Sequence, residues 1–91
     1  MSGITIEHQV SPAKLDTMSV DAWPIWSKEA STFDWSYDKE EICYILEGKA
    51  IVTPTEGEAV TIQRGDLVRF PAGLNCTWEI VEAIEKHYTF L

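Results

Sequence analysis

The sequence Glu-Ile-Cys-Tyr-Ile-Leu-Glu-Gly occupies residues 41–48, and both of its alternating phases are mostly apolar. A strand with one solvent face alternates apolar and polar residues, whereas a strand covered on both faces does not. We therefore predict that this run forms a central strand of a β-sheet. Glu41 and Cys43 fall in the phase that we expect to face the core.

The opposite phase of this strand, Ile42, Tyr44 and Leu46, is also apolar and needs a cover of its own. One candidate is the N-terminal segment, which carries Trp23 and Trp26. The other is a second copy of the chain. Since closed two-fold dimers are the commonest assemblies of soluble proteins, we expect a homodimer.

The same period of two recurs along the chain, and no apolar pattern of helical period is sustained. The segment from Val10 to Ala22 is the least regular part, and we interpret it as a loop with a short helical turn. Short strands with frequent turns are typical of a β-sandwich, jelly roll or barrel. The runs are separated by residues typical of turns: Glu47-Gly48, Thr55-Glu56-Gly57-Glu58, Arg64-Gly65-Asp66 and Pro71-Ala72-Gly73.

The length of the chain limits it to one domain. Its 91 residues are 45% hydrophobic, which is enough for one packed core. We expect residues 1–22 to form an N-terminal strand and irregular segment of the same domain, and residues 23–91 to form the barrel. A net charge of −8 makes nucleic acid and membrane surfaces unfavourable partners.

The N-terminus shows neither a basic region followed by an apolar run nor a stretch of membrane-spanning length, so we expect a cytoplasmic protein. The two cysteines, Cys43 and Cys76, are too few for a disulfide-rich scaffold or a four-thiolate zinc site. We interpret them as free thiols.

Strand phase also predicts which side chains face into the barrel. In residues 33–38 the aromatic side chains share one phase, and in residues 76–80 the apolar side chains do so. In residues 84–90 Lys86 shares the inward phase, while His87 faces outward. The candidate ligand-binding residues are Trp35, Tyr37, Glu41, Cys43, Cys76, Trp78, Lys86 and Tyr88.

Two spaced patterns carry a family resemblance. Glu41 is followed by Gly48, and Gly65 is followed by Pro71-Ala72-Gly73 and then Cys76. Together they resemble the two motifs of the cupin superfamily, which implies an all-β double-stranded β-helix, or jelly-roll, barrel. Further segments are similar to the small single-domain cupins that resemble the cupin domain of ureidoglycine aminohydrolase. These segments are Trp23-Pro24-Ile25-Trp26, Phe33-Asp34-Trp35-Ser36-Tyr37-Asp38 and Lys86-His87-Tyr88.

The chain departs from that family at the metal site. Metal-binding cupins place histidines where this chain has Trp35, Tyr37 and Cys76, and Glu41 alone remains of the usual ligand set. An indole cannot ligate a metal, because its nitrogen is only a donor. We therefore predict no metal and no cofactor. The alternative is a divergent metal enzyme that uses Tyr37, Glu41 and Cys76.

Glu41 is the expected chemical centre, because a buried carboxylate needs a compensating partner. Lys86 either pairs with it or lies at the rim with its ammonium in water. Tyr37 is the other candidate partner, and Cys76 becomes a nucleophile if a cation approaches it. These four residues are the candidate catalytic set.

Three functions are consistent with this pattern. The first is a metal-independent cupin that binds or transforms a small polar metabolite inside the barrel. The second is a non-catalytic dimeric module with a filled barrel, and the third is the divergent metal enzyme.

Overall fold

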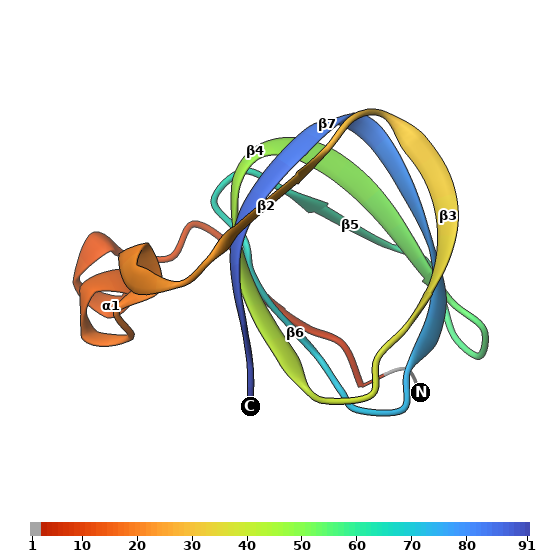
Figure 1. Cartoon of the computed structure of the whole chain (residues 1–91), viewed down its shortest axis with the longest axis horizontal. Helices are drawn as coiled ribbons and strands as arrows, with labels where there is room; N and C mark the ends of the chain where they lie inside the picture. Colours follow the sequence, from red (N-terminus) through yellow and green to blue (C-terminus); the bar gives the residue numbers. More distant parts are fainter. Residues whose placement is uncertain (1–2) are drawn as a thin grey trace.

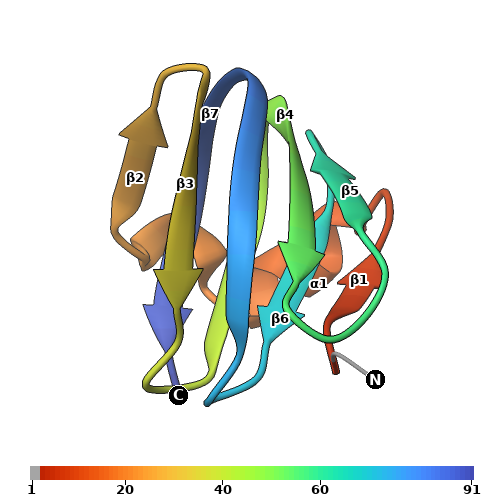
Figure 2. The same ribbon diagram turned by 90° about the vertical axis from the view of Figure 1, so that its right-hand side faces the viewer.

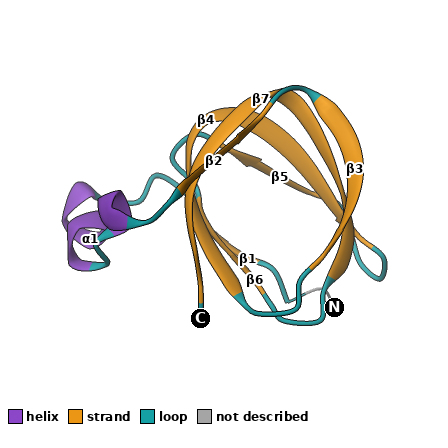
Figure 3. Cartoon of the chain, viewed as in Figure 1, coloured by secondary structure: helices purple, strands orange, loops and turns teal. Residues whose placement is uncertain are grey.

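A computed structural model describes residues 3–91 and shows a barrel of antiparallel strands with a short helical segment outside it (Figures 1 and 3). Within these residues, seven strands form one sheet in the order β1-β6-β4-β7-β2, while β3 also pairs with β7 and β5 with β4. The strands are β1 (Thr5–Glu7), β2 (Ile25–Lys28), β3 (Ser31–Ser36), β4 (Glu41–Pro54), β5 (Val60–Gln63), β6 (Leu67–Phe70) and β7 (Asn75–Phe90).

Two long, curved strands connect the two halves of the barrel. The first part of β4 pairs with β6 and with the end of β7, and its second part pairs with β5 and with the start of β7. In the same way, β7 pairs first with β3 and then with β2. Figure 2 shows both strands running the height of the barrel. The predicted all-β barrel is therefore confirmed.

The turn predicted at Glu47-Gly48 is wrong, because β4 continues through it with shifts of register against β7. Gly48 has a φ of +92°, and a Cβ there would lie 2.1 Å from the carbonyl oxygen of Ala83. Only glycine allows such an approach without displacing the backbone. The bulge changes the phase of β4, so that Cys43 and Ile45 face inward before it and Ala50 and Val52 after it.

The N-terminal segment covers the outer face of β4, which was one of the two predicted covers. It contains helix α1 (Pro12–Thr17) and the 3-10 helix η1 (Val20–Ala22), so the expected helical turn is present. Ser11 caps α1 by accepting a hydrogen bond from the Lys14 backbone N–H at 3.2 Å. Around Ile42, which is buried, this cover and the adjoining strands contribute Val10, Leu15, Met18, Trp23, Tyr44 and Leu67. None of the helices in residues 3–91 has the length and apolar character needed to cross a membrane.

The expectation that Trp26 helps to cover this outer face is wrong. Trp26 pairs with Lys86 across β2 and β7, and directly opposed residues of antiparallel strands share a face. Since Lys86 points into the barrel, Trp26 does so too, and it packs against the inner core. The outward position of His87 is confirmed: its Nδ1 lies 2.8 Å from the carbonyl oxygen of Trp23.

Candidate functional site

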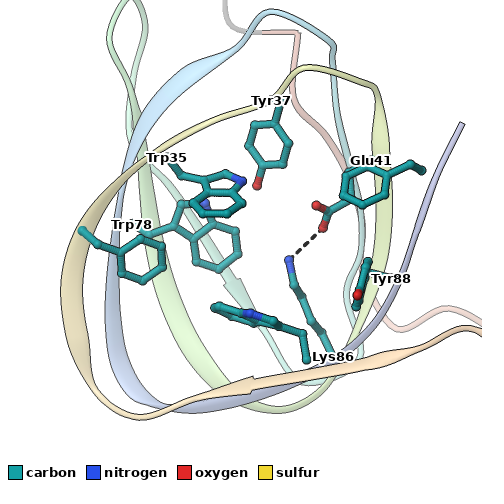
Figure 4. Close-up of a pocket in the computed structure, with 9 residues that line it drawn as sticks. Trp35, Tyr37, Glu41, Trp78, Lys86 and Tyr88 are labelled. Atoms are coloured by element: carbon teal, nitrogen blue, oxygen red, sulfur yellow. Dashed lines mark hydrogen bonds and ion pairs between the residues drawn. The ribbon is translucent and has the colours of Figure 1, made fainter.

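A cavity of about 200 Å³ lies inside the barrel, against side chains from β2, β3, β4 and β7. Figure 4 shows how the labelled side chains surround it. Trp35 and Phe90 are about half exposed and form its opening. The lining residues are Trp26, Phe33, Trp35, Tyr37, Glu41, Trp78, Lys86, Tyr88 and Phe90.

A buried ion pair forms the polar part of the cavity wall. Lys86 Nζ donates a hydrogen bond to Glu41 Oε2 over 2.8 Å, and the two side chains are 7% and 5% exposed. Glu41 begins β4, whose first part pairs with the last part of β7, and this pairing places both residues on the same inner face. Two positions were predicted for Lys86, an ion pair with Glu41 or a place at the rim with the ammonium in water, and the structure shows the ion pair.

Aromatic rings surround the Lys86 ammonium on its other sides. Its Nζ lies 4.8 Å from the ring centroid of Trp78, 5.1 Å from that of Trp26 and 5.9 Å from that of Phe70. Ring faces attract cations, and they do so more strongly where water is excluded. The rings and the Glu41 carboxylate therefore each offset part of the cost of burying the ammonium.

Tyr37 carries a hydroxyl into the cavity (Figure 4). Its backbone N–H donates to the Leu74 carbonyl at 2.9 Å, and its ring stacks on Phe70 with 4.8 Å between centroids. Burial, followed by the neighbouring Glu41 carboxylate, raises the pKa of this phenol far above its usual value. Tyr37 therefore keeps its proton and remains able to donate a hydrogen bond.

The two thiols lie in the core rather than in the cavity wall. Cys43 is fully buried, and burial raises the pKa of its thiol to about 12. Burial also raises the pKa of Cys76, whose Sγ lies 3.6 Å from the Trp35 carbonyl oxygen. Both groups are protonated thiols at neutral pH, so neither has the character of an activated nucleophile.

The indole N–H of Trp78 is, within residues 3–91, the single buried side-chain polar atom without a well-formed hydrogen bond. It lies near the Tyr37 oxygen and the Cys76 sulfur, and it opposes the rise in their pKa values. Because its nitrogen is enclosed, it contributes to the wall and not to the accessible polar surface.

The structure brings six of the eight sequence-predicted ligand-binding residues together around the cavity: Trp35, Tyr37, Glu41, Trp78, Lys86 and Tyr88. Cys43 and Cys76 do not line the cavity and lie instead in the buried core cluster. Three further lining residues, Trp26, Phe33 and Phe90, were not in the predicted set. The inward phase of their strands already indicated Phe33 and Phe90, whereas Trp26 required the pairing of β2 with β7.

The side chains present do not fit a transition-metal site. Within residues 3–91, no three His, Cys, Asp or Glu side chains gather in a way that would hold a metal ion. Glu41 faces an ammonium instead, and Tyr37 and Cys76 both retain protons that ligation would have to displace.

Comparison with known proteins places the chain in a family. The model of the EutQ-like cupin domain matches residues 15–88. A DUF861 family protein from Thermotoga maritima is similar to the chain, with 51% identity over 97% of this chain and 99% of that one and a TM-score of 0.93. A comparison with curated proteins gives no match.

Two EutQ proteins share the fold at lower identity. A putative ethanolamine utilization protein Q from Salmonella typhimurium is 24% identical over 72% of this chain, with a TM-score of 0.66, and this chain covers 53% of it. The Clostridium difficile EutQ protein is 18% identical over 96% of this chain, with a TM-score of 0.67, and 66% of that protein is covered. On the extent of the family match and the 51% identity to a full-length relative, the chain belongs to the EutQ-like cupin domain family.

Proposed function

We propose that the protein binds a small polar or planar metabolite inside the barrel without a metal ion. The observation that carries this proposal is the buried Glu41–Lys86 pair in the wall of an otherwise aromatic cavity. A buried ion pair contributes little to stability, because desolvation offsets much of its attraction. Charged groups kept in such a cavity are candidates for ligand recognition.

The cavity supports binding more directly than turnover. Lys86 neutralises the carboxylate that would act as a base, and the Tyr37 phenol and both thiols hold their protons. Glu41, Lys86 and Tyr37 are therefore assigned to orienting a ligand between the aromatic walls. Cys76 has no such role here, because it does not line the cavity.

The likeness to the cupin domain of ureidoglycine aminohydrolase stays a prediction from the sequence, and we do not extend that enzyme's reaction to this chain. The EutQ proteins are longer than this chain, which spans about half of the Salmonella protein. We therefore do not extend ethanolamine utilization to this chain either.

The second candidate function is a non-catalytic dimeric module with a filled barrel. The open cavity favours the binding proposal over it, since a filled barrel would leave no space beside Glu41. The third candidate, a divergent metal enzyme, is disfavoured by the protonated Tyr37 and Cys76.

The chain offers an internal control for a binding experiment. Trp26, Trp35 and Trp78 line the cavity, whereas Trp23 packs on the outer face of β4. We propose to screen small metabolites by NMR and follow the four indole N–H signals. A ligand in the barrel shifts the three cavity signals and leaves that of Trp23 in place. A screen in which no compound does so would contradict the proposal.

A further inference from the structure

The cavity offers a charged ligand no uncompensated opposite charge. Its two ionic lining groups, Glu41 and Lys86, neutralise each other across 2.8 Å. Within a space of about 200 Å³, a ligand anion lies close to the Glu41 carboxylate and a ligand cation lies close to the Lys86 ammonium. A ligand charge is repelled by one member of the pair and attracted by the other, so the pair provides little net attraction to offset the cost of desolvating that charge. The net charge of −8 further opposes the approach of an anion.

Beside the ion pair, the wall carries one acceptor and one donor that can engage the same ligand group. Lys86 Nζ is engaged by Glu41 and enclosed by rings. Within residues 3–91 the Lys86 hydrogen bond goes to Glu41 Oε2, which leaves Glu41 Oε1 without a side-chain donor, and the Tyr37 hydroxyl, which lies near the Trp78 indole N–H, donates to no side chain. Figure 4 shows this hydroxyl and the Glu41 carboxylate pointing into the same space.

The walls select for flat molecules of small size. Seven of the nine lining side chains are aromatic, and ring faces pack best against other planar groups. The cavity volume of about 200 Å³ lies below the 300–1,000 Å³ of sites for drug-sized ligands. A single ring with one small polar group matches this space.

From these observations we infer that the ligand is an uncharged, planar carboxamide or lactam. Its N–H donates to Glu41 Oε1, and its carbonyl oxygen accepts from the Tyr37 hydroxyl. This inference rests on the proposed function, because it names the chemical class bound at the same site.

Four probes that share one ring test this class: benzamide, benzoate, benzylamine and toluene. Each is titrated into the protein at neutral pH while the indole N–H signals are followed. Benzamide is expected to bind at least about tenfold more tightly than each of the other three, because it alone satisfies both polar groups without a charge.

Two conservative variants test the assigned contacts. Tyr37→Phe keeps the ring stacked on Phe70, and Glu41→Gln keeps the shape of the side chain. Each variant is expected to bind benzamide about three- to tenfold more weakly than the natural protein does and to bind toluene with unchanged affinity. Tyr44→Phe removes a hydroxyl from the outer face and is the matched control.

The possible outcomes separate the ligand class from the site itself. Benzoate or benzylamine binding as tightly as benzamide overturns the inference in favour of an anion or cation site. Toluene binding equally well overturns it in favour of an apolar site. If none of the four probes shifts the cavity indoles, the result contradicts the proposed function and the inference together.

Discussion

Lys86 donates to Glu41 over 2.8 Å although the two residues lie 45 positions apart in the chain. The pairing of β4 with β7 brings them together, and the rings of Trp26 and Trp78 enclose the ammonium. The ion pair therefore forms only when β4 and β7 pair in the folded barrel.

Breaking this pair on one side is expected to destabilise the fold. Lys86→Met leaves the Glu41 carboxylate buried and unpaired, which costs about 3–5 kcal/mol of unfolding free energy. The double variant Glu41→Leu/Lys86→Met should lie within about 1 kcal/mol of the natural protein or above it, because apolar replacement removes both desolvation costs. Chemical denaturation measures these values.

The control for that measurement is an exposed pair, Lys14 with Glu7. Lys14→Met should change the unfolding free energy by less than about 1 kcal/mol. A Lys86→Met variant no less stable than Lys14→Met would contradict the role given to the buried pair.

The raised pKa of Cys43 predicts a pH dependence of its reactivity. A thiol with a pKa of about 12 is almost entirely protonated at pH 8–10, and the reactive species is the thiolate. Iodoacetamide should therefore leave Cys43 unmodified in the native protein over this range, and should modify Cys76 more slowly than in the unfolded chain, because burial raises the pKa of that thiol as well. In denaturant both thiols should react, as mass spectrometry would show. Rapid native alkylation of Cys76 would restore it as a candidate nucleophile.

Gly48 should be far less tolerant of substitution than Gly73. Both have positive φ, +92° and +86°, so the backbone strain of alanine is similar at the two positions, about 1–2 kcal/mol. At Gly48 the added Cβ would also collide with the Ala83 carbonyl, whereas nothing lies within 4 Å at Gly73. Thermal unfolding should show a much larger loss for Gly48→Ala, and equal losses would argue against the close approach at the bulge.

The homodimer expected from the outer face of β4 stays a prediction. The N-terminal segment buries Ile42 but leaves Tyr44 and Leu46 partly exposed, so a second copy would complete the cover. Light scattering at high micromolar concentration should report twice the chain mass. A monomer would contradict the prediction and leave the N-terminal segment as the whole cover.

Local alternation was enough to predict the barrel, the inward phases of β3 and β7 and the inward position of Glu41, because these depend on neighbouring residues. It could not place Trp26, whose inward position depends on pairing with Lys86 far along the chain. Nor could it distinguish a turn from a bulge at Gly48, since glycine serves both. Strand phase alone placed the thiols among the lining residues, although both lie in the core and not in the cavity wall.

The measurement that tests the central claim most directly is ligand binding by protein treated with a metal chelator. A metabolite found in the indole screen is titrated into natural protein before and after chelation, and into Glu41→Gln. We predict equal affinity before and after chelation and weaker binding by Glu41→Gln. The indole N–H signals of Trp26, Trp35 and Trp78 should shift, and that of Trp23 should not. Binding that disappears on chelation and returns with added metal, or that is unchanged in Glu41→Gln, would contradict a metal-independent site centred on Glu41.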